Sequence, residues 1–207
     1  MPFLLSDKQV DIPLGVLQRA PTVFDGVFAD GTLASPYANM SSDRNAALNT
    51  AVNAVVLAQS LALNAAKPNG SVQVIGNGLA QYHDANAGFP ADDGMGMVPF
   101  LDGVCVEHWA AFEMTDASNC SLVPSKMVDM MERIAVVASL NKTVLVKGWP
   151  GPISLPITSF GPSWPASCGT GPGESHAARG QSALRYFTPS YALFLLVADD
   201  TVWWSYS

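Results

Sequence analysis

The sequence predicts an α/β fold built around a parallel sheet. Five short apolar runs bounded by turn residues are typical of buried strands, and they begin near residues 24, 72, 101, 143 and 201. Helical patterns separate several of these runs. Because strands that alternate with helices form right-handed βαβ units, we expect one domain over residues 1–207, with helices on both faces of the sheet. Such a sheet is either doubly wound or part of a (β/α)₈ barrel.

Three segments carry the helical patterns. Residues 45–66 are rich in Ala, Leu and Val, and they stop before a Pro-Asn-Gly turn. Residues 124–140 begin with Pro124, a residue favoured at helix starts. Together with Val123 just before them, they carry apolar residues at the spacing of one helix face: Val123, Met127, Met130, Ile134 and Val137. Residues 176–198 contain Thr188-Pro189, an N-cap followed by a helix-initiating proline, which predicts two helices there.

Composition and charge limit the classes of partner. The chain is 49% hydrophobic and 13% charged, which is typical of a globular protein. Its formal charge of −7 argues against binding to nucleic acid or an anionic membrane. No apolar stretch approaches the roughly 20 residues that span a bilayer. We therefore expect a soluble chain with no membrane span and a neutral, polar partner.

Several motifs of metal, cofactor and nucleophilic chemistry are missing from the sequence. Cys105, Cys120 and Cys168 form no CxxC, and no HExxH or GxSxG occurs. The glycine-rich residues 169–175 lack the lysine of a P-loop. We therefore expect no metal and no cofactor, while one disulfide among the three cysteines remains open.

The compartment also remains open between two interpretations. Four asparagines begin Asn-x-Ser/Thr triplets, which favours a secreted glycoprotein: Asn39, Asn69, Asn119 and Asn141. The N-terminus shows no basic-then-apolar leader pattern. Either a leader has been lost or the triplets are accidental.

Two of the predicted strands share a motif that ends in a carboxylate. Residues 24–30 and 101–107 both read apolar, Asp, Gly, Val, two small or apolar residues, then Asp30 or Glu107. The carboxyl ends of parallel strands meet at the edge of the sheet where ligands bind. With one strand between them, the two carboxyl groups would lie about 5–9 Å apart, which is the separation used by glycosidases. Acidic residues at strand ends also cap helices, so a structural role stays open.

These residues resemble a family of TIM-barrel glycoside hydrolases with an Asp-Gly-Val-Phe signature on strand four and a Val-Glu-His signature on strand six. The chain is most similar to the hypothetical glycosyl hydrolase family fifteen, and more distantly to the endo-α-galactosaminidase family. The similarity covers nearly the whole chain and is carried by residues 24–30, 75–78, 103–109 and 148–151.

The resemblance implies a retaining hydrolase acting on an oligo- or polysaccharide, with Asp30 as nucleophile and Glu107 as general acid and then base. The five predicted strands would be strands four to eight. Too little chain precedes residue 24 for strands one to three, so we expect a truncated barrel. Its open edge would need a protein partner or self-association. The alternative function is a catalytically silent carbohydrate-binding or interaction subunit.

Five further residues are candidates for binding the substrate. Lys147 and Trp149 share strand parity, so an ammonium and an indole can both face the sugar. Asn77 ends the strand between the two acids, although asparagine is also a good turn residue. His108 follows Glu107, so its side chain lies on the opposite face of the strand. We therefore expect His108 to support the site through a hydrogen bond and not to act as a base. Trp204 offers aromatic surface, but it also suits the core of a last strand.

Overall fold

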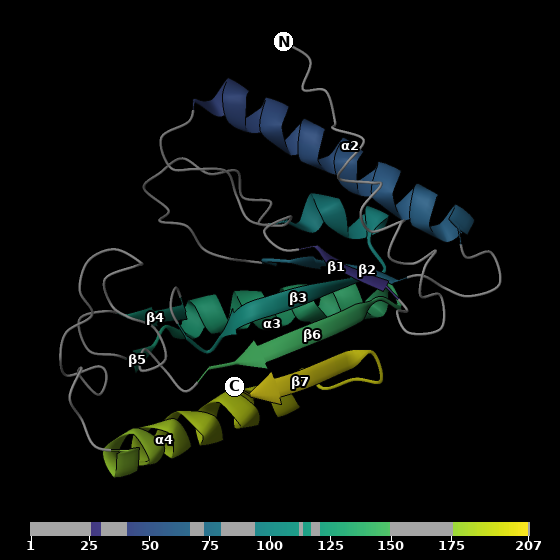
Figure 1. Ribbon diagram of the computed structural model, residues 1–207. Coiled ribbons are helices and arrows are strands. Elements are labelled where there is room, and N and C mark those ends of the chain that lie inside the picture. The colour runs from purple at the N-terminus through teal and green to yellow at the C-terminus, as the bar shows by residue number, and fades with distance from the viewer. Residues whose placement is uncertain are drawn as a thin grey trace. The chain divides into compact units, whose positions relative to one another are not determined.

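The computed structural model describes residues 26–29, 41–66, 73–79, 94–111, 114–116, 121–149 and 176–206. A five-stranded parallel sheet has the order β1-β2-β3-β6-β7, so neighbours along the chain are neighbours in the sheet (Figure 1). The predicted α/β class and its five strands are confirmed. The strand bounds are β1 Gly26–Ala29, β2 Gln73–Asn77, β3 Gly103–Trp109, β6 Thr143–Gly148 and β7 Val202–Tyr206.

The helices also occur where the patterns predict them, at α2 Ser42–Ala66, α3 Pro124–Ser139 and α4 His176–Leu195. The apolar stripe of α3 is buried as predicted, at Met127, Met130, Ile134 and Val137. Asn141, two residues after the last residue of α3, adopts a left-handed φ of 56° and donates its N–H to the carbonyl of Ala138. Asparagine tolerates this conformation, which explains how the helix stops without a glycine.

One helix differs from the sequence-based prediction. Helix α4 continues through Thr188-Pro189 instead of dividing there. Pro189 has no N–H to donate to the carbonyl of Arg185. Aromatic packing on both sides of the proline offsets this lost hydrogen bond, because Phe187 and Tyr191 both contact Trp204.

Among the residues that the structure describes, three short elements have no predicted counterpart. They are the 3₁₀ helix η2 (Met95–Phe100) and the antiparallel strands β4 (Thr115–Asp116) and β5 (Ser121–Leu122). Elements of two to six residues are too short to show a periodic pattern. The Pro- and Gly-rich composition of the segment from Gly148 to Gly173 predicts a long loop, and this segment lies outside the described residues from residue 150 onward.

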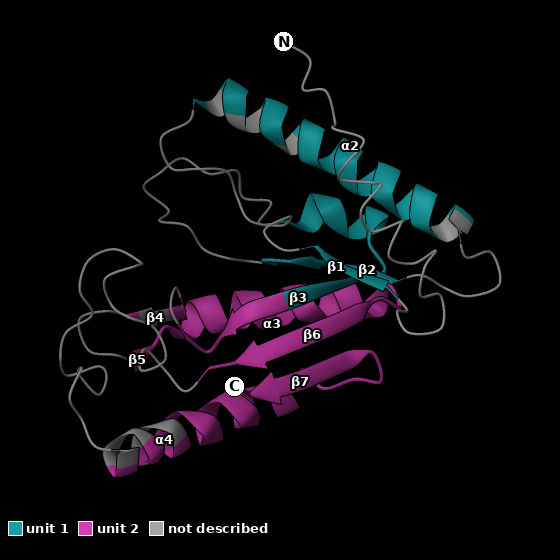
Figure 2. Cartoon of the chain, in the orientation of Figure 1, with its two compact units in different colours: residues 1–105 teal, residues 106–207 magenta. Residues whose placement is uncertain are grey.

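The chain divides into two compact units, residues 1–105 and 106–207 (Figure 2). In unit 1, β1 pairs with β2 in parallel, and Gly26 lies so close to Gln73 that a Cβ there would overlap the Gln73 carbonyl oxygen. Val74 donates its N–H to the Asp102 carboxylate at 2.9 Å, and Asp102 returns its own N–H to the Val74 carbonyl. Asp102 therefore extends the ladder between β2 and β3.

Unit 2 contains the rest of β3, together with β6, β7, α3 and α4. Along β6, burial alternates strictly: Val144, Val146 and Gly148 are buried, whereas the residues between them are half-exposed. Strand β7 keeps the same parity, because Val144 pairs with Val202 and Lys147 with Ser205. One face, called here the helix face, therefore carries Val144, Val146, Gly148, Val202, Trp204 and Tyr206.

The opposite face, called the open face, carries Leu145, Lys147, Trp203 and Ser205. Right-handed crossovers between strands that follow one another in order place α3 and α4 on a single side of the sheet. Trp203 is 62% exposed, in keeping with an open face free of these two helices. The expectation of helices on both faces is therefore wrong for the described part of unit 2, because the strand order never reverses.

An aromatic cluster joins α4 to the helix face. Phe187 and Tyr191 of α4 lie 4.9–5.8 Å, centroid to centroid, from each other and from Trp204 or Tyr206. Trp109, at the end of β3, donates its indole N–H to the Ser190 carbonyl at 2.9 Å. These contacts fix the carboxyl end of β3 and β7 against one helix. Within the described segments, no helix combines the length and apolar character that a membrane crossing requires.

We predict that Gly148→Ala destabilises the protein by about 1–3 kcal/mol, the usual cost of overpacking. The added Cβ would lie 2.9 Å from the Ser190 hydroxyl oxygen and 3.0–3.1 Å from the rings of Tyr206 and Trp204. The control is Gly180→Ala on α4, where a Cβ meets nothing within 4 Å. That change should stabilise by about 0.4–1 kcal/mol. Urea unfolding of both variants measures the difference, and equal effects would contradict this packing.

We also predict that Tyr206 makes the protein less stable at high pH. Burial raises the pKa of Tyr206 from 10.0 to about 12. The neutral phenol is therefore favoured in the folded state, and this contribution is present below pH 10 and lost as the pH rises toward 12. Free energies of unfolding measured from pH 8 to 12 should fall less steeply for Tyr206→Phe than for the wild type. Parallel curves above pH 10 would contradict the prediction.

Candidate functional site

The candidate site is centred on Glu107, two residues before the end of β3 in unit 2. Its carboxylate oxygen Oε1 lies 3.5 Å from the Nζ atom of Lys147. The two side chains are 28% and 31% exposed, so both polar groups remain accessible to a solute. Lys147 lies on the open face, and the ion pair therefore forms on the side away from α3 and α4.

Trp149 completes a cluster of three residues, called here the Glu107 cluster: Glu107, Lys147 and Trp149. The ammonium of Lys147 lies 3.9 Å from the centroid of the Trp149 ring, within the range of a cation–π contact. The indole N–H of Trp149 donates to the backbone carbonyl of Glu107 at 2.5 Å. Glu107 is thus held at its main chain by Trp149 and at its side chain by Lys147. The predicted shared orientation of Lys147 and Trp149 agrees with these contacts.

Two aromatic residues extend the surroundings of the cluster. The His108 ring packs edge-on against Trp149, with centroids 6.4 Å apart. Trp203 of β7 lies beside Leu145 in register, on the same face as Lys147. The sequence offers Trp203 and its neighbour Trp204 alike as aromatic surface for carbohydrate. Strand parity separates the two, because Trp203 and Lys147 both fall on the odd-numbered face.

The remaining candidates lie elsewhere or are not described. Trp204 lies on the helix face, packed among Phe187, Tyr191 and Tyr206, which matches its alternative role in the strand core. Asn77, in unit 1, ends β2 and is 3% exposed. The turn after it is built by two backbone N–H groups that donate to the Cys105 carbonyl. Asp30 lies outside the described residues.

The chemistry available to the Glu107 cluster follows from its three groups. A half-exposed carboxylate can donate or accept a proton, and an ammonium can hydrogen-bond hydroxyl or carboxylate oxygens. Indole rings can stack on apolar faces of a ligand. Within the ranges that the structure describes, no three His, Cys, Asp or Glu side chains gather to bind a metal ion. Neither the family models nor the curated proteins give a match to the chain, so the cluster is interpreted from its own chemistry.

Proposed function

We propose that the protein hydrolyses glycosidic bonds in an oligo- or polysaccharide and that Glu107 is the residue that transfers the proton. One observation carries the proposal: an accessible carboxylate near the carboxyl end of a parallel strand, held between an ammonium and an indole. This combination matches the needs of sugar chemistry, which uses a carboxylate for proton transfer and aromatic surface for binding.

The topology gives independent support. A parallel sheet whose order follows the chain without reversal is the arrangement found in (β/α)₈ barrels and not in doubly wound sheets. Barrel enzymes place their catalytic groups near the carboxyl ends of the strands, which is where Glu107 lies in β3. In this proposal β1, β2, β3, β6 and β7 correspond to the last five strands of a barrel-like unit.

The proposed reaction has two steps and retains the configuration of the sugar. In the first step, a carboxylate nucleophile, proposed to be Asp30, bonds to the anomeric carbon while Glu107 gives its proton to the departing glycosidic oxygen. In the second step, Glu107 takes a proton from water, and the resulting hydroxide displaces the nucleophile from the sugar. Lys147 orients the Glu107 carboxylate, and the exposed Trp203 ring on the same face offers a stacking surface.

A second candidate function is carbohydrate binding without hydrolysis. It is favoured by the exposed indole of Trp203, because stacking on a sugar ring requires no second carboxylate. In that case Lys147 and Trp203 would bind the sugar, and Glu107 would serve only to orient Lys147. The two candidates differ in whether turnover depends on Glu107.

We predict that Glu107→Gln lowers the release of reducing ends from a panel of polysaccharides by about 10²–10⁴-fold, the usual contribution of a general acid–base residue. Asp30→Asn should lower it similarly. The glutamine variant keeps the size of the side chain and a hydrogen bond to Lys147 but cannot transfer the proton. Sugar binding, measured by quenching of tryptophan fluorescence, should persist in both variants.

The matched control is Glu132→Gln, which makes the same chemical change on the exposed side of α3. It should leave turnover unchanged. Full activity of Glu107→Gln would exclude the proton-transfer role. Sugar binding by the wild type without turnover of any glycoside would instead favour the second candidate.

A further inference from the structure

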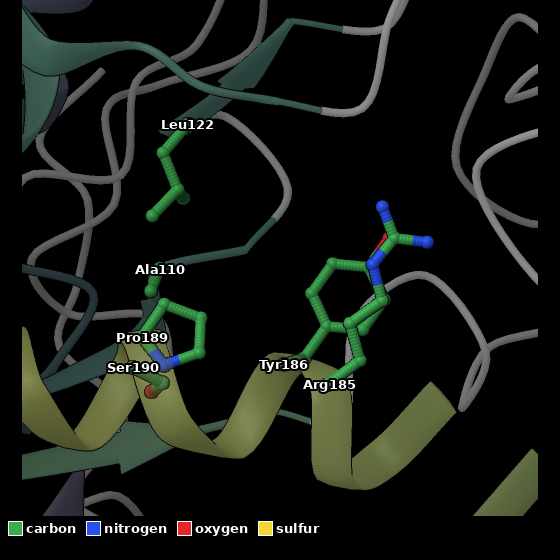
Figure 3. Close-up of a pocket in the computed structure, with 6 residues that line it drawn as sticks. All are labelled: Ala110, Leu122, Arg185, Tyr186, Pro189 and Ser190. Atoms are coloured by element: carbon green, nitrogen blue, oxygen red, sulfur yellow. The ribbon is translucent and has the colours of Figure 1, made fainter. Parts of the chain in front are cut away.

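A cavity of about 240 Å³ lies in unit 2, apart from the residues of the Glu107 cluster (Figure 3). Three elements line it: the end of β3, strand β5 and the middle of α4. The lining residues are Ala110, Leu122, Arg185, Tyr186, Pro189 and Ser190. The volume is smaller than the roughly 300–1,000 Å³ of pockets for drug-sized ligands, so it suits a small molecule.

The walls of the cavity divide by polarity. Figure 3 shows the Arg185 and Tyr186 side chains together on one side, with Leu122, Ala110 and Pro189 across from them. The polar wall offers a guanidinium and a phenol hydroxyl, both hydrogen-bond donors. The side chains across from it, Leu122, Ala110 and Pro189, are hydrocarbon. A ligand that fits both walls carries an acceptor group at one end and an apolar body at the other.

The positive charge of Arg185 indicates that the acceptor group of the ligand is an anion. Arg185 is exposed at the cavity, and among the described residues it forms no ion pair. A guanidinium has a planar fork of donors that matches a carboxylate in two parallel hydrogen bonds. The chain as a whole carries a formal charge of −7, so binding by Arg185 would reflect local recognition and not general attraction of anions.

Two backbone features and one buried hydroxyl occur at residues that line the cavity. Pro189 removes the helical hydrogen bond to the carbonyl of Arg185, which is itself a lining residue. Ala110 adopts a left-handed φ of 55°, although it has a side chain. Ser190 is 2% exposed, and its hydroxyl has no hydrogen-bond partner among the residues that the structure describes. That hydroxyl lies toward Gly148 and Trp204, between α4 and the sheet, so the polar side-chain groups facing the cavity are those of Arg185 and Tyr186.

We propose that this cavity binds a small organic carboxylate, with the anionic group on Arg185 and Tyr186 and the apolar body against Leu122, Ala110 and Pro189. The site is separate from the proposed hydrolytic function and does not depend on it. It uses Ala110, which follows β3, and residues of α4 and β5, none of which takes part in the Glu107 cluster.

The test compares benzoate with benzamide, a neutral molecule of nearly the same shape, by ligand-observed NMR on the full chain. Benzoate should bind at least about tenfold more tightly than benzamide, the factor expected for about 1.4 kcal/mol from a charge-assisted pair. Arg185→Gln should lower the affinity for benzoate about tenfold and leave that for benzamide nearly unchanged. The control Arg133→Gln removes the same charge from α3, where Arg133 pairs with Asp129 at 3.2 Å.

A second variant tests the apolar wall. Leu122→Trp enlarges a half-exposed side chain into the cavity and should abolish binding of both probes while the fold persists, as judged by circular dichroism. The proposal is overturned if benzoate does not bind or binds no better than benzamide. It is also overturned if both arginine variants weaken benzoate equally, or if Leu122→Trp binds it as the wild type does.

Discussion

The alternation of side chains along β6 is the constraint on which the rest of unit 2 depends. Val144 and Val146 are fully buried on the helix face. Because side chains alternate along a strand, Lys147 must then lie on the open face. A shift of one residue in register would exchange the two faces and bury an ammonium. The position of Lys147 beside Glu107 is therefore a consequence of the packing of Val144 and Val146, and not of attraction between the two charges.

The relative free energies support the view that packing, and not the ion pair, determines the orientation of these side chains. A half-exposed ion pair contributes only about 0–1 kcal/mol, whereas each fully buried valine contributes roughly 1.5–3 kcal/mol. The contacts of the Glu107 cluster therefore position the carboxylate and do little to hold the fold together. The aromatic cluster of α4 and β7 has the opposite character, because Tyr206 is buried enough to have a raised pKa of about 12. In β6 and β7, stability and chemistry are thus separated between the two faces, whereas in β3 the residues that share the parity of Glu107, Cys105 and Trp109, are buried as well.

Sequence patterns predicted the long elements well, because buried strands and an amphipathic helix such as α3 repeat their signal over many residues. They failed where a single residue was decisive. Pro189 predicted a helix start, yet α4 runs through it because Phe187 and Tyr191 pack on either side. The sequence also suggested Trp204 as a ligand contact, whereas register with β6 turns Trp203 to the open face. The cavity could not be predicted, because its walls come from segments far apart in the chain.

Cysteine labelling at adjacent positions of β6 tests the division of the faces most directly. Lys147→Cys and Val146→Cys would each be treated with a thiol reagent under native conditions, and labelling at these positions would be followed by peptide mass spectrometry. The account predicts rapid modification at position 147 and protection at position 146 until the protein unfolds, since these side chains are 31% exposed and buried, respectively. Equal rates, or faster labelling at position 146, would contradict it and remove the basis for an accessible Glu107 cluster.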